Sequence, residues 1–306
     1  MNRETLDQFG LRPQLPQFMD HSCSGTYSEC ERMWYYSYAL GRRNIRVDRV
    51  ALDWGTIVHQ LADVWERTHS LDAVKAVVEA VPDSFNADDR YGRNKGRMYE
   101  MMSEWLGYRT VNPMEILRTE QPTVVSCNSA CPYSTDGCGL TYGGRMDSIV
   151  GWQGLIGPLD IKTTVMNDTD PVAEYKLSHQ MMGYDWLASH LMQKHCWGVI
   201  VERIVTNKSA IKISRFPVSY SNAMIREWVT DEKERQYRIG TQFAVHQYNE
   251  SGWIQNRARC ANPYMCQWRD VCLSPNDNDF RARWLRDNTV ESRWDFTKVD
   301  QETTNG

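Results

Sequence analysis

One short segment of the chain carries residue types that phosphodiester chemistry requires. The run GPLDIKTT at 157–164 places Asp160 and Lys162 two residues apart. If this run is a strand, its period of two sends both side chains to the same face. A second acid, Asp147 in GGRMDSIV, comes alongside if the two runs pair as a hairpin. Two carboxylates beside an ammonium suit a hard divalent cation such as Mg²⁺ or Mn²⁺, which would activate water for attack on a phosphodiester.

A D-x-K triplet alone is more often a solvated strand face with a surface ion pair, and such pairs are common and weak. Here, however, the triplet belongs to a series of four runs: GTIVH at 55–59, GRMD at 144–147, DIK at 160–162 and QMMGY at 180–184. In this order the series resembles the RecB-like PD-(D/E)xK nuclease family, which includes RecB and AddB nuclease domains, CRISPR adaptation nucleases and phage exonucleases. The resemblance covers about residues 22–275 and implies a metal-dependent DNA nuclease.

The resemblance implies a role for each matching residue. His59 becomes a metal ligand from the first helix, Asp147 the metal-bridging carboxylate and Asp160 the second acidic ligand. The carbonyl of Ile161 would complete the metal shell. Lys162 becomes the catalytic lysine, which positions or activates the attacking water and stabilises the transition state. Without the series, a lone histidine on an amphipathic helix is more often a satisfied interior residue.

Two further residues, Gln180 and Tyr184, lie four apart and therefore share one helix face. The resemblance implies that Gln180 supports Lys162 or a phosphate, as a catalytic and substrate-binding residue, and that Tyr184 contacts the DNA strand. The alternative for both is ordinary packing. Glu120, on the strand before Asp147, matches a family glutamate only loosely and is given a supporting role.

Four of the nine cysteines form a second implied metal site. The segment SGTYSECERMWYYSYALG resembles the start of the iron–sulfur members of the family and supplies Cys30, while CANPYMCQWRDVC supplies Cys260, Cys266 and Cys272. The resemblance implies a structural [4Fe–4S] cluster on these four thiolates. The first two cysteines of the trio are separated by five residues, where the family more often has two. Structural Zn²⁺ is the main alternative, because tetrahedral thiolate sets serve both, and free thiols are another.

The other cysteines are less informative. Cys127, Cys131 and Cys138 lie in SCNSACPYSTDGCG, an insertion between predicted strands, and could form another metal site with an unidentified fourth ligand. An ordinary loop is the more common outcome for such a segment. Cys23 could be the fourth ligand or a substitute for Cys30, and Cys196 is interpreted as a small buried hydrophobe.

The pattern of apolar and turn residues predicts the elements that position these side chains. Helical spacing predicts helices at 54–68, 71–81, 94–108, about 172–193 and 220–248. Runs rich in β-branched residues predict a three-stranded meander over 115–125, 140–152 and 154–164, then strands at 197–205 and 209–218. With the resemblance, this order predicts an α/β restriction-endonuclease-like core: a mixed central sheet flanked by helices, with helical N- and C-terminal segments joined by a metal cluster.

The composition is that of a folded protein. The 306 residues are 41% hydrophobic, and the net charge of -4 argues against a uniformly basic, histone-like mode of DNA binding. We expect a flexible segment at 1–20, a nuclease domain at 21–275 whose cluster clamp is formed by 22–45 and 255–275, and a tail at 276–306. No run reaches the ~20 apolar residues that cross a bilayer, which leads us to expect a cytoplasmic protein of a bacterial or phage-infected cell.

The resemblance implies an exonuclease that acts on single-stranded DNA or DNA ends. The sequence leaves open whether it serves recombination, repair, phage genome processing or spacer acquisition. The sequence contains no G-x-x-x-x-G-K-[ST] loop, so unwinding would come from a helicase or recombination partner. Trp34, Tyr35 and Tyr36 could stack on bases, although packing of the N-terminal helix is the simpler role. Two alternatives remain open: a catalytically silent DNA-binding or scaffold protein that keeps the fold and cluster, and a metal-stapled protein-interaction module.

Overall fold

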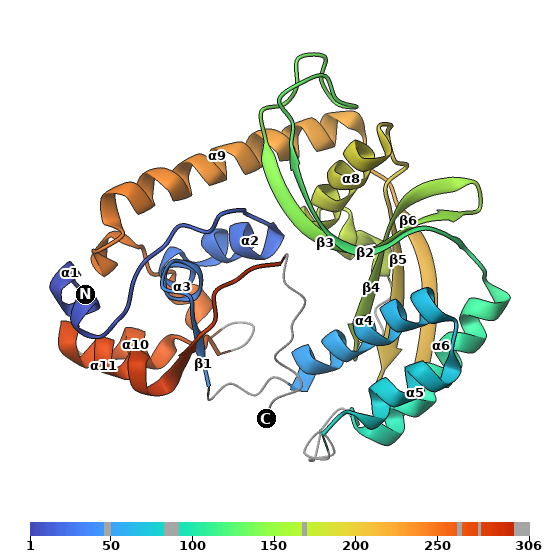
Figure 1. Ribbon diagram of the computed structural model, residues 1–306, viewed down its shortest axis with the longest axis horizontal. Coiled ribbons are helices and arrows are strands. Elements are labelled where there is room, and N and C mark those ends of the chain that lie inside the picture. The colour runs from blue at the N-terminus through green and yellow to red at the C-terminus, as the bar shows by residue number, and fades with distance from the viewer. Residues whose placement is uncertain (46–49, 83–91, 167–169, 262–264, 275–276, 297–306) are drawn as a thin grey trace. The chain divides into compact units, whose positions relative to one another are not determined.

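The computed structural model describes residues 1–45, 50–82, 92–166, 170–261, 265–274 and 277–296 (Figure 1). The chain forms two compact units. The first, which we call the sheet unit, comprises residues 49–138 and 144–226; the second, the aromatic unit, comprises residues 1–48, 139–143 and 227–306. Among the described residues, no helix combines the length and the apolar character that a membrane span requires.

A five-stranded mixed sheet forms the centre of the sheet unit. Its spatial order is β2-β3-β4-β5-β6, and the strands are β2 (Glu115–Ser126), β3 (Thr141–Trp152), β4 (Leu155–Thr164), β5 (Val199–Thr206) and β6 (Ile211–Val218). β4 pairs antiparallel with β3 and parallel with β5, and β6 is antiparallel to β5. Parallel pairing requires a crossover, and the connection from β4 to β5 contains α7 (Pro171–Tyr175) and α8 (His179–Met192). The mixed central sheet flanked by helices is therefore confirmed.

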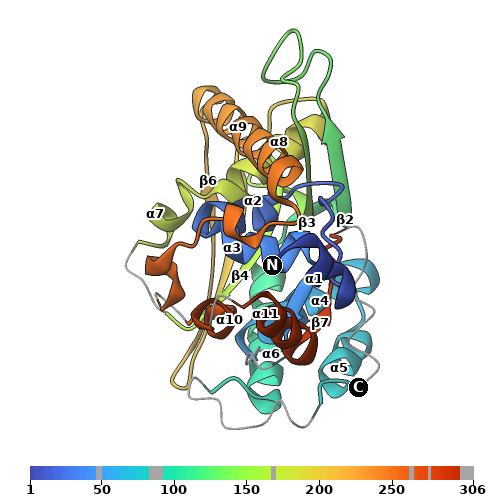
Figure 2. The same ribbon diagram turned by 90° about the vertical axis from the view of Figure 1, so that its left-hand side faces the viewer.

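Three helices pack against one face of this sheet: α4 (Val50–Thr68), α5 (Leu71–Glu79) and α6 (Lys95–Val111) (Figure 1 and Figure 2). Their buried cluster includes Leu159 and Ile161 of β4. Because strand side chains alternate between faces, Asp160 and Lys162 point to the opposite face. There α8 packs against β4 and β5. The alternation on β4 thus separates the hydrophobic core from the polar residues of the candidate site.

A buried charge network joins α4 and α6 to the sheet. Glu202 of β5 is fully buried and accepts hydrogen bonds from Trp105 Nε1 (2.6 Å), Arg109 Nε (2.9 Å) and Arg215 Nε (2.9 Å). Arg109 also pairs with Glu66 of α4 at 3.2 Å. Burial acts to raise the pKa of Glu202, but the two guanidinium groups outweigh it and hold the pKa below its ordinary value. Glu202 is therefore the centre of a buried, charged network that crosses the interface between the helices and the sheet.

The helix predicted over 172–193 is two helices in the structure. α7 ends at Tyr175, and α8 begins at His179 with Ser178 as its N-cap, whose hydroxyl accepts a hydrogen bond from Met181 N at 3.4 Å. An N-cap serine satisfies an amide that the first turn of a helix leaves without a backbone partner. The break starts α8 immediately before Gln180, which therefore lies in its first turn.

The aromatic unit is mainly helical. Its elements are α1 (Arg3–Gln8), α2 (His21–Glu29), α3 (Glu31–Trp34), the π-helical turn η1 (Tyr35–Ala39), β1 (Arg42–Asn44), the greater part of α9 (Asn222–His246), η3 (Glu250–Gly252), η4 (Arg257–Cys260), α10 (Arg269–Leu273), α11 (Asn278–Asn288) and β7 (Thr289–Glu291). β1 and β7 pair antiparallel.

Stacked aromatic rings form the core of this unit. Trp34 and Tyr35 both stack on Trp253, with ring centroids 5.2 and 5.3 Å apart, and Tyr36 contacts Trp268 at 5.3 Å. All three N-terminal rings are fully buried. Packing, and not base stacking, is therefore the role of Trp34, Tyr35 and Tyr36 in this fold.

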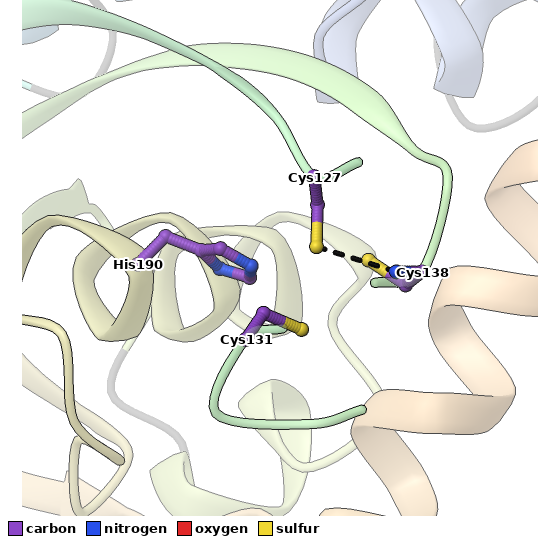
Figure 3. Close-up of side chains that lie close together, drawn as sticks. All are labelled: Cys127, Cys131, Cys138 and His190. Atoms are coloured by element: carbon purple, nitrogen blue, oxygen red, sulfur yellow. Dashed lines mark hydrogen bonds between the residues drawn. The ribbon is translucent and has the colours of Figure 1, made fainter. Parts of the chain in front are cut away.

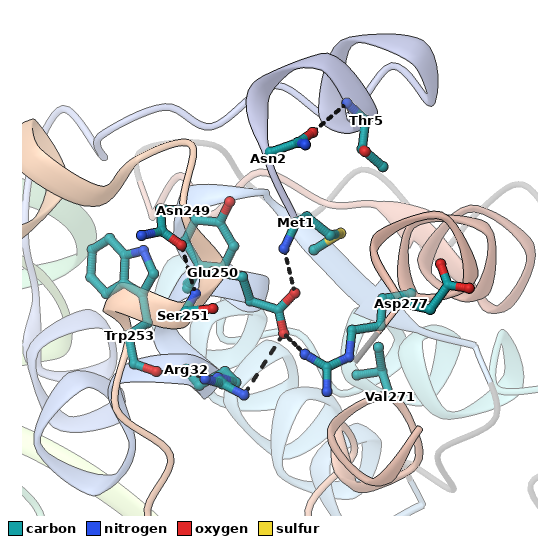
Figure 4. A network of polar contacts seen from close by, with 12 residues as sticks. Met1, Asn2, Thr5, Arg32, Asn249, Glu250, Ser251, Trp253, Val271 and Asp277 are labelled. Carbon is teal, nitrogen blue, oxygen red and sulfur yellow. Dashed lines mark hydrogen bonds and ion pairs between the residues drawn. The ribbon is translucent and has the colours of Figure 1, made fainter. Parts of the chain in front are cut away.

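Glu250 is the charged centre of the aromatic unit (Figure 4). This carboxylate, 1% exposed, pairs with Arg281 at 2.8 Å, with the Met1 amine at 3.2 Å and with Arg32 at 3.8 Å, and accepts a hydrogen bond from Tyr36 OH at 2.6 Å. A buried carboxylate is tolerated when cations and donors surround it in this way. The network therefore ties four distant segments of the chain together.

The structure differs from the sequence expectation at both ends of the chain. Residues 1–20, expected to be flexible, contain α1, and Leu6 and Leu11 are buried in the aromatic core. The expected tail contains α11 and β7, and Ala282 and Leu285 are fully buried. The few apolar residues in these polar segments supply the surface that docks them.

Candidate functional site

Asp160 and Lys162 lie side by side on β4. Lys162 Nζ is 3.1 Å from Asp160 Oδ2, and Asp160 is only 2% exposed. Apart from this ammonium, Asp160 Oδ2 is buried without a hydrogen-bond donor among the residues that the structure describes. A buried carboxylate oxygen is normally satisfied by donors, and one that is not has a free coordination position for a cation.

Asp147 of β3 lies beside the same peptide. The antiparallel register, which sets Ser148 opposite Leu159, brings Asp147 next to the Asp160–Ile161 peptide. Asp147 Oδ2 accepts a hydrogen bond from Ile161 N at 2.7 Å, and its Oδ1 lies 2.7 Å from His59 Nδ1. One carboxylate therefore joins β3, β4 and α4.

Gln180 and Tyr184 extend this cluster along α8. Gln180 Oε1 accepts a hydrogen bond from Lys162 Nζ at 2.9 Å, and Gln180 Nε2 donates to Tyr184 OH at 3.0 Å. The Tyr184 hydroxyl in turn donates to the carbonyl of Arg145 at 2.7 Å. Because Tyr184 is only 5% exposed, this geometry favours a positioning role over the direct DNA contact that the resemblance implies. The side chain of Glu120, which was given a supporting role, lies outside the described residues.

The two acids of the cluster differ electrostatically. Burial raises the pKa of Asp160, and the charge of Asp147 adds to this effect, so that the pKa lies above its ordinary value despite Lys162. Burial also acts to raise the pKa of Asp147, but His59 and the Ile161 amide outweigh it and hold that pKa below its ordinary value. For His59, burial acts to lower the pKa, and the adjacent Asp147 reverses the direction. An added divalent cation would relieve the repulsion between the two carboxylates.

The sequence-predicted residues of the first site therefore come together within the sheet unit. His59, Asp147, the Ile161 peptide, Lys162, Gln180 and Tyr184 are linked by hydrogen bonds, and Asp160 pairs with Lys162. They come from α4, β3, β4 and α8, four elements that are well separated in the chain. Such a set of oxygen donors with one lysine can hold a hard cation and approach a phosphate.

The four cysteines of the implied cluster lie in the aromatic unit. Cys30 forms the junction between α2 and α3, and its Sγ accepts a hydrogen bond from Asn256 N at 3.4 Å. Cys266 N donates to the carbonyl of Cys260 at 3.1 Å. Burial raises the pKa of Cys272 to about 12, and charges on Cys266 and Cys30 act in the same direction. Cys30 Sγ and Cys260 Sγ thus both contact the backbone of Asn256, but the four described thiols do not come together within 4.8 Å of one another.

A separate group of thiols lies in the sheet unit, where Cys127, Cys131 and Cys138 of the β2–β3 connection meet His190 of α8 (Figure 3). The sequence interpretation missed His190, because nothing in the local spacing links it to the loop. Cys23, suggested there as a fourth ligand, is instead a fully buried residue of the aromatic unit, and its Sγ accepts a hydrogen bond from Trp34 Nε1 at 3.2 Å. Cys196 is buried, as expected.

Comparisons with known proteins show which superfamily the chain belongs to. The chain matches the model of the PD-(D/E)XK nuclease superfamily over residues 21–273. No curated protein matches the chain. The solved structure described as "Crystal structure of SSO0001" is similar over 79% of this chain and 91% of that chain, with 16% sequence identity and a TM-score of 0.32. Because the superfamily match spans most of the sequence, including the mixed sheet and its acidic cluster, the chain belongs to the PD-(D/E)XK nuclease superfamily.

Proposed function

We propose that this protein is a RecB-like exonuclease that hydrolyses single-stranded DNA, or the ends of DNA, with Mg²⁺ or Mn²⁺. Membership of the superfamily supports metal-dependent nuclease chemistry. The observation that carries the proposal is the convergence of Asp147, Asp160 and Lys162 on one polar cluster beneath α8. Any unwinding of duplex DNA would come from a helicase or recombination partner.

Asp147, Asp160, His59 and the carbonyl of Ile161 would hold the cation. The residues fit this group, because Asp160 presents a buried oxygen whose one described partner is the Lys162 ammonium, and carboxylate and carbonyl oxygens are the ligands that Mg²⁺ and Mn²⁺ prefer. When bound, the cation supplies an activated water and neutralises charge on the scissile phosphate.

Lys162 would be the catalytic lysine. Its described contacts, to Asp160 and Gln180, use two of the three donors of the ammonium. The third can donate to the attacking water or to a phosphate oxygen, whose negative charge grows in the transition state. Gln180 holds Nζ in place, and Tyr184 holds Gln180, so the chain of hydrogen bonds orients the lysine before substrate arrives.

The experiment is digestion of end-labelled single strands in Mn²⁺ by wild type, Asp160→Ala and Lys162→Ala. We expect each variant to lose at least about 10³-fold in rate, equivalent to about 4 kcal/mol of transition-state stabilisation. Asp63→Ala removes an acid that pairs with Arg67 one turn along α4, and Lys212→Ala removes an exposed lysine of β6, so both serve as controls that keep wild-type rates. Unchanged digestion by Asp160→Ala would exclude this residue from catalysis. An inactive wild type would favour the silent scaffold instead.

The exonuclease part of the proposal is tested separately with circular single-stranded DNA. An exonuclease requires an end, so the circle should persist while the linear form of the same strand is digested. Comparable cleavage of both forms would leave the nuclease site intact and assign it to an endonuclease.

We further propose that Cys30, Cys260, Cys266 and Cys272 hold a [4Fe–4S] cluster. The resemblance of the two cysteine-containing segments to the iron–sulfur members of the family carries this proposal, and the amide that donates to Cys30 Sγ suits a thiolate bound to iron. Such a cluster would join the α2–α3 junction to the segment around α10, as a structural clamp. Anaerobic purification, visible absorption and iron analysis test this proposal. A colourless protein with zinc on these four cysteines would replace iron by Zn²⁺.

A further inference from the structure

The β2–β3 connection and α8 together form a compact set of metal donors. Among the residues that the structure describes, one group of three or more His, Cys, Asp or Glu residues has ligand atoms that all lie within 4.8 Å of one another: Cys127, Cys131, Cys138 and His190. In a tetrahedral zinc site with Zn–S bonds of about 2.3 Å, neighbouring donors are roughly 3.8 Å apart. In Figure 3 the thiols and the imidazole ring point toward one another. A contraction of at most about 1 Å would therefore complete a tetrahedral shell.

His190 supplies independent evidence for a ligand at this position. Its side chain is only 7% exposed, and its Nδ1 lies 2.7 Å from the backbone carbonyl of Trp186. A carbonyl only accepts hydrogen bonds, so Nδ1 carries the proton and Nε2 retains its lone pair. Nε2 is buried, and no residue in the described part of the chain forms a hydrogen bond with it. A histidine that ligates a metal usually donates its other N–H to a carbonyl in just this manner.

The loop is folded so that its three cysteines meet. Cys138 N donates to Cys127 Sγ at 3.3 Å, and a tight turn closes between Cys131 and Ser134 with amide-to-carbonyl distances of 2.8 and 3.2 Å. Gly137 has a φ of +81°, and a Cβ there would lie 2.7 Å from the backbone of Ser129. The loop therefore requires glycine at this position to bring Cys138 back toward Cys127.

Tyr133 already attaches this loop to α8. Its hydroxyl donates to Ser189 Oγ at 2.8 Å, and its ring packs against His190 at a centroid distance of 6.0 Å. No disulfide joins any of the nine cysteines, all of which lie among the described residues, so none performs the linkage that a metal would provide.

We propose that Cys127, Cys131, Cys138 and His190 bind one structural Zn²⁺ that fastens the β2–β3 connection to the C-terminal half of α8. Three soft thiolates with one imidazole select zinc over the hard cations of the carboxylate site. A single ion also suits the close spacing better than an iron–sulfur cluster, because a cluster of several irons holds its thiolates farther apart. The site is closed by four protein ligands, as structural zinc sites are.

The proposed zinc site lies near the C-terminal end of α8, the helix whose N-terminal end carries residues of the carboxylate cluster. Gln180 and Tyr184 lie toward the N-terminus of the same helix, six or more residues before His190. Loss of zinc would loosen the C-terminal end of α8 and the loop first. We expect stability to fall more than the chemical competence of the carboxylate cluster.

The test is the zinc content of the full chain, purified in thiol reductant with Zn²⁺ supplied and then washed with a weak chelator. Cys131→Ser and His190→Ala should each contain one zinc equivalent per chain less than wild type. The matched control Cys196→Ala changes a buried cysteine outside the group and should keep the wild-type content. Because the loss is measured as a difference, any zinc on the four cysteines of the aromatic unit cancels.

A conservative variant separates loss of a ligand from loss of the fold. His190→Cys replaces imidazole by a thiolate and should keep the zinc equivalent that His190→Ala loses. Wild type should also melt at a lower temperature after treatment with a strong chelator, with a smaller shift in Cys131→Ser. The proposal is overturned if His190→Ala and Cys131→Ser keep the wild-type zinc content, or if the anaerobically prepared protein has a disulfide between two of these three cysteines.

Discussion

Replacing Asp160 by asparagine should lower nuclease activity and at the same time raise the stability of the fold. Asp160 is 2% exposed, and burial together with the charge of Asp147 holds its pKa above the ordinary value. Asparagine keeps the shape of the side chain and removes the buried charge. A residue placed for cation binding should show these opposite effects, because its charge is costly until the cation is present.

The expected gain in stability follows from the structure. Each unit by which the pKa of a carboxyl rises on folding lowers the free energy of unfolding at neutral pH by about 1.4 kcal/mol. The contact with Lys162 offsets part of this cost, but the lysine side chain is 28% exposed and such partly solvated pairs contribute only about 0–1 kcal/mol. We therefore expect Asp160→Asn to be more stable than wild type by about 0.5–2 kcal/mol in the absence of metal.

The stability difference between wild type and Asp160→Asn should change in a defined direction with pH and with Mn²⁺. A carboxyl whose pKa is raised by folding contributes stability that is present below its unfolded pKa and is lost as the pH rises through its folded pKa. The advantage of Asp160→Asn should therefore grow from acidic to neutral pH. Mn²⁺ at ten times its dissociation constant would stabilise wild type by about 1.4 kcal/mol. The variant should lack most of this increment.

The assay combines urea unfolding in chelator, urea unfolding in Mn²⁺ and digestion of labelled single strands. The control is Asp63→Asn, which changes a partly exposed ion pair with Arg67. It should leave both unfolding free energies and the rate of digestion close to the wild-type values. If Asp160→Asn were less stable than wild type in chelator and digested DNA at the wild-type rate, Asp160 would be a structural ion-pair partner and the reasoning would fail.

Three further predictions concern other parts of the molecule. Glu202→Ala should lower the free energy of unfolding by about 3–5 kcal/mol, because it leaves the fully buried Arg215 guanidinium without its carboxylate. Urea unfolding measures this loss of stability. A loss below about 1 kcal/mol would contradict the prediction. Burial raises the pKa of Asp20 from 3.8 to about 6, so ionisation of Asp20 should cost about 3 kcal/mol of stability as the pH rises through this window. Asp20→Asn should flatten that part of the stability profile, and an unchanged slope between these pH values would refute the assignment. Gln180→Ala should slow digestion by roughly 10–100-fold, because Lys162 loses the acceptor that positions it. Gln180→Glu keeps an acceptor oxygen for Lys162 and should retain more activity. Equal losses of activity in both variants would argue against a positioning role for Gln180.

The local features of the sheet unit were predictable from sequence. β-branched runs bounded by glycine and proline predicted β2, β3 and β4 to within a residue or two at each end, because these residues pack well on a pleated surface and turns interrupt them. The common face of Asp160 and Lys162 followed from the period of the strand alone. The break between α7 and α8 was also a local signal, the N-cap Ser178, but the apolar periodicity on both sides of it concealed the break.

Only the tertiary structure decided which distant residues meet. His190 lies 52 residues beyond Cys138 in the chain, and it reaches the loop because α8 packs against the sheet beside the β2–β3 connection. Burial at the two ends of the chain likewise depended on a partner surface, the aromatic core, that no local window contains. Period and propensity determine the direction of a side chain relative to its own element. Which donors lie within bonding distance depends on how the elements pack, and this packing is a property of the whole chain.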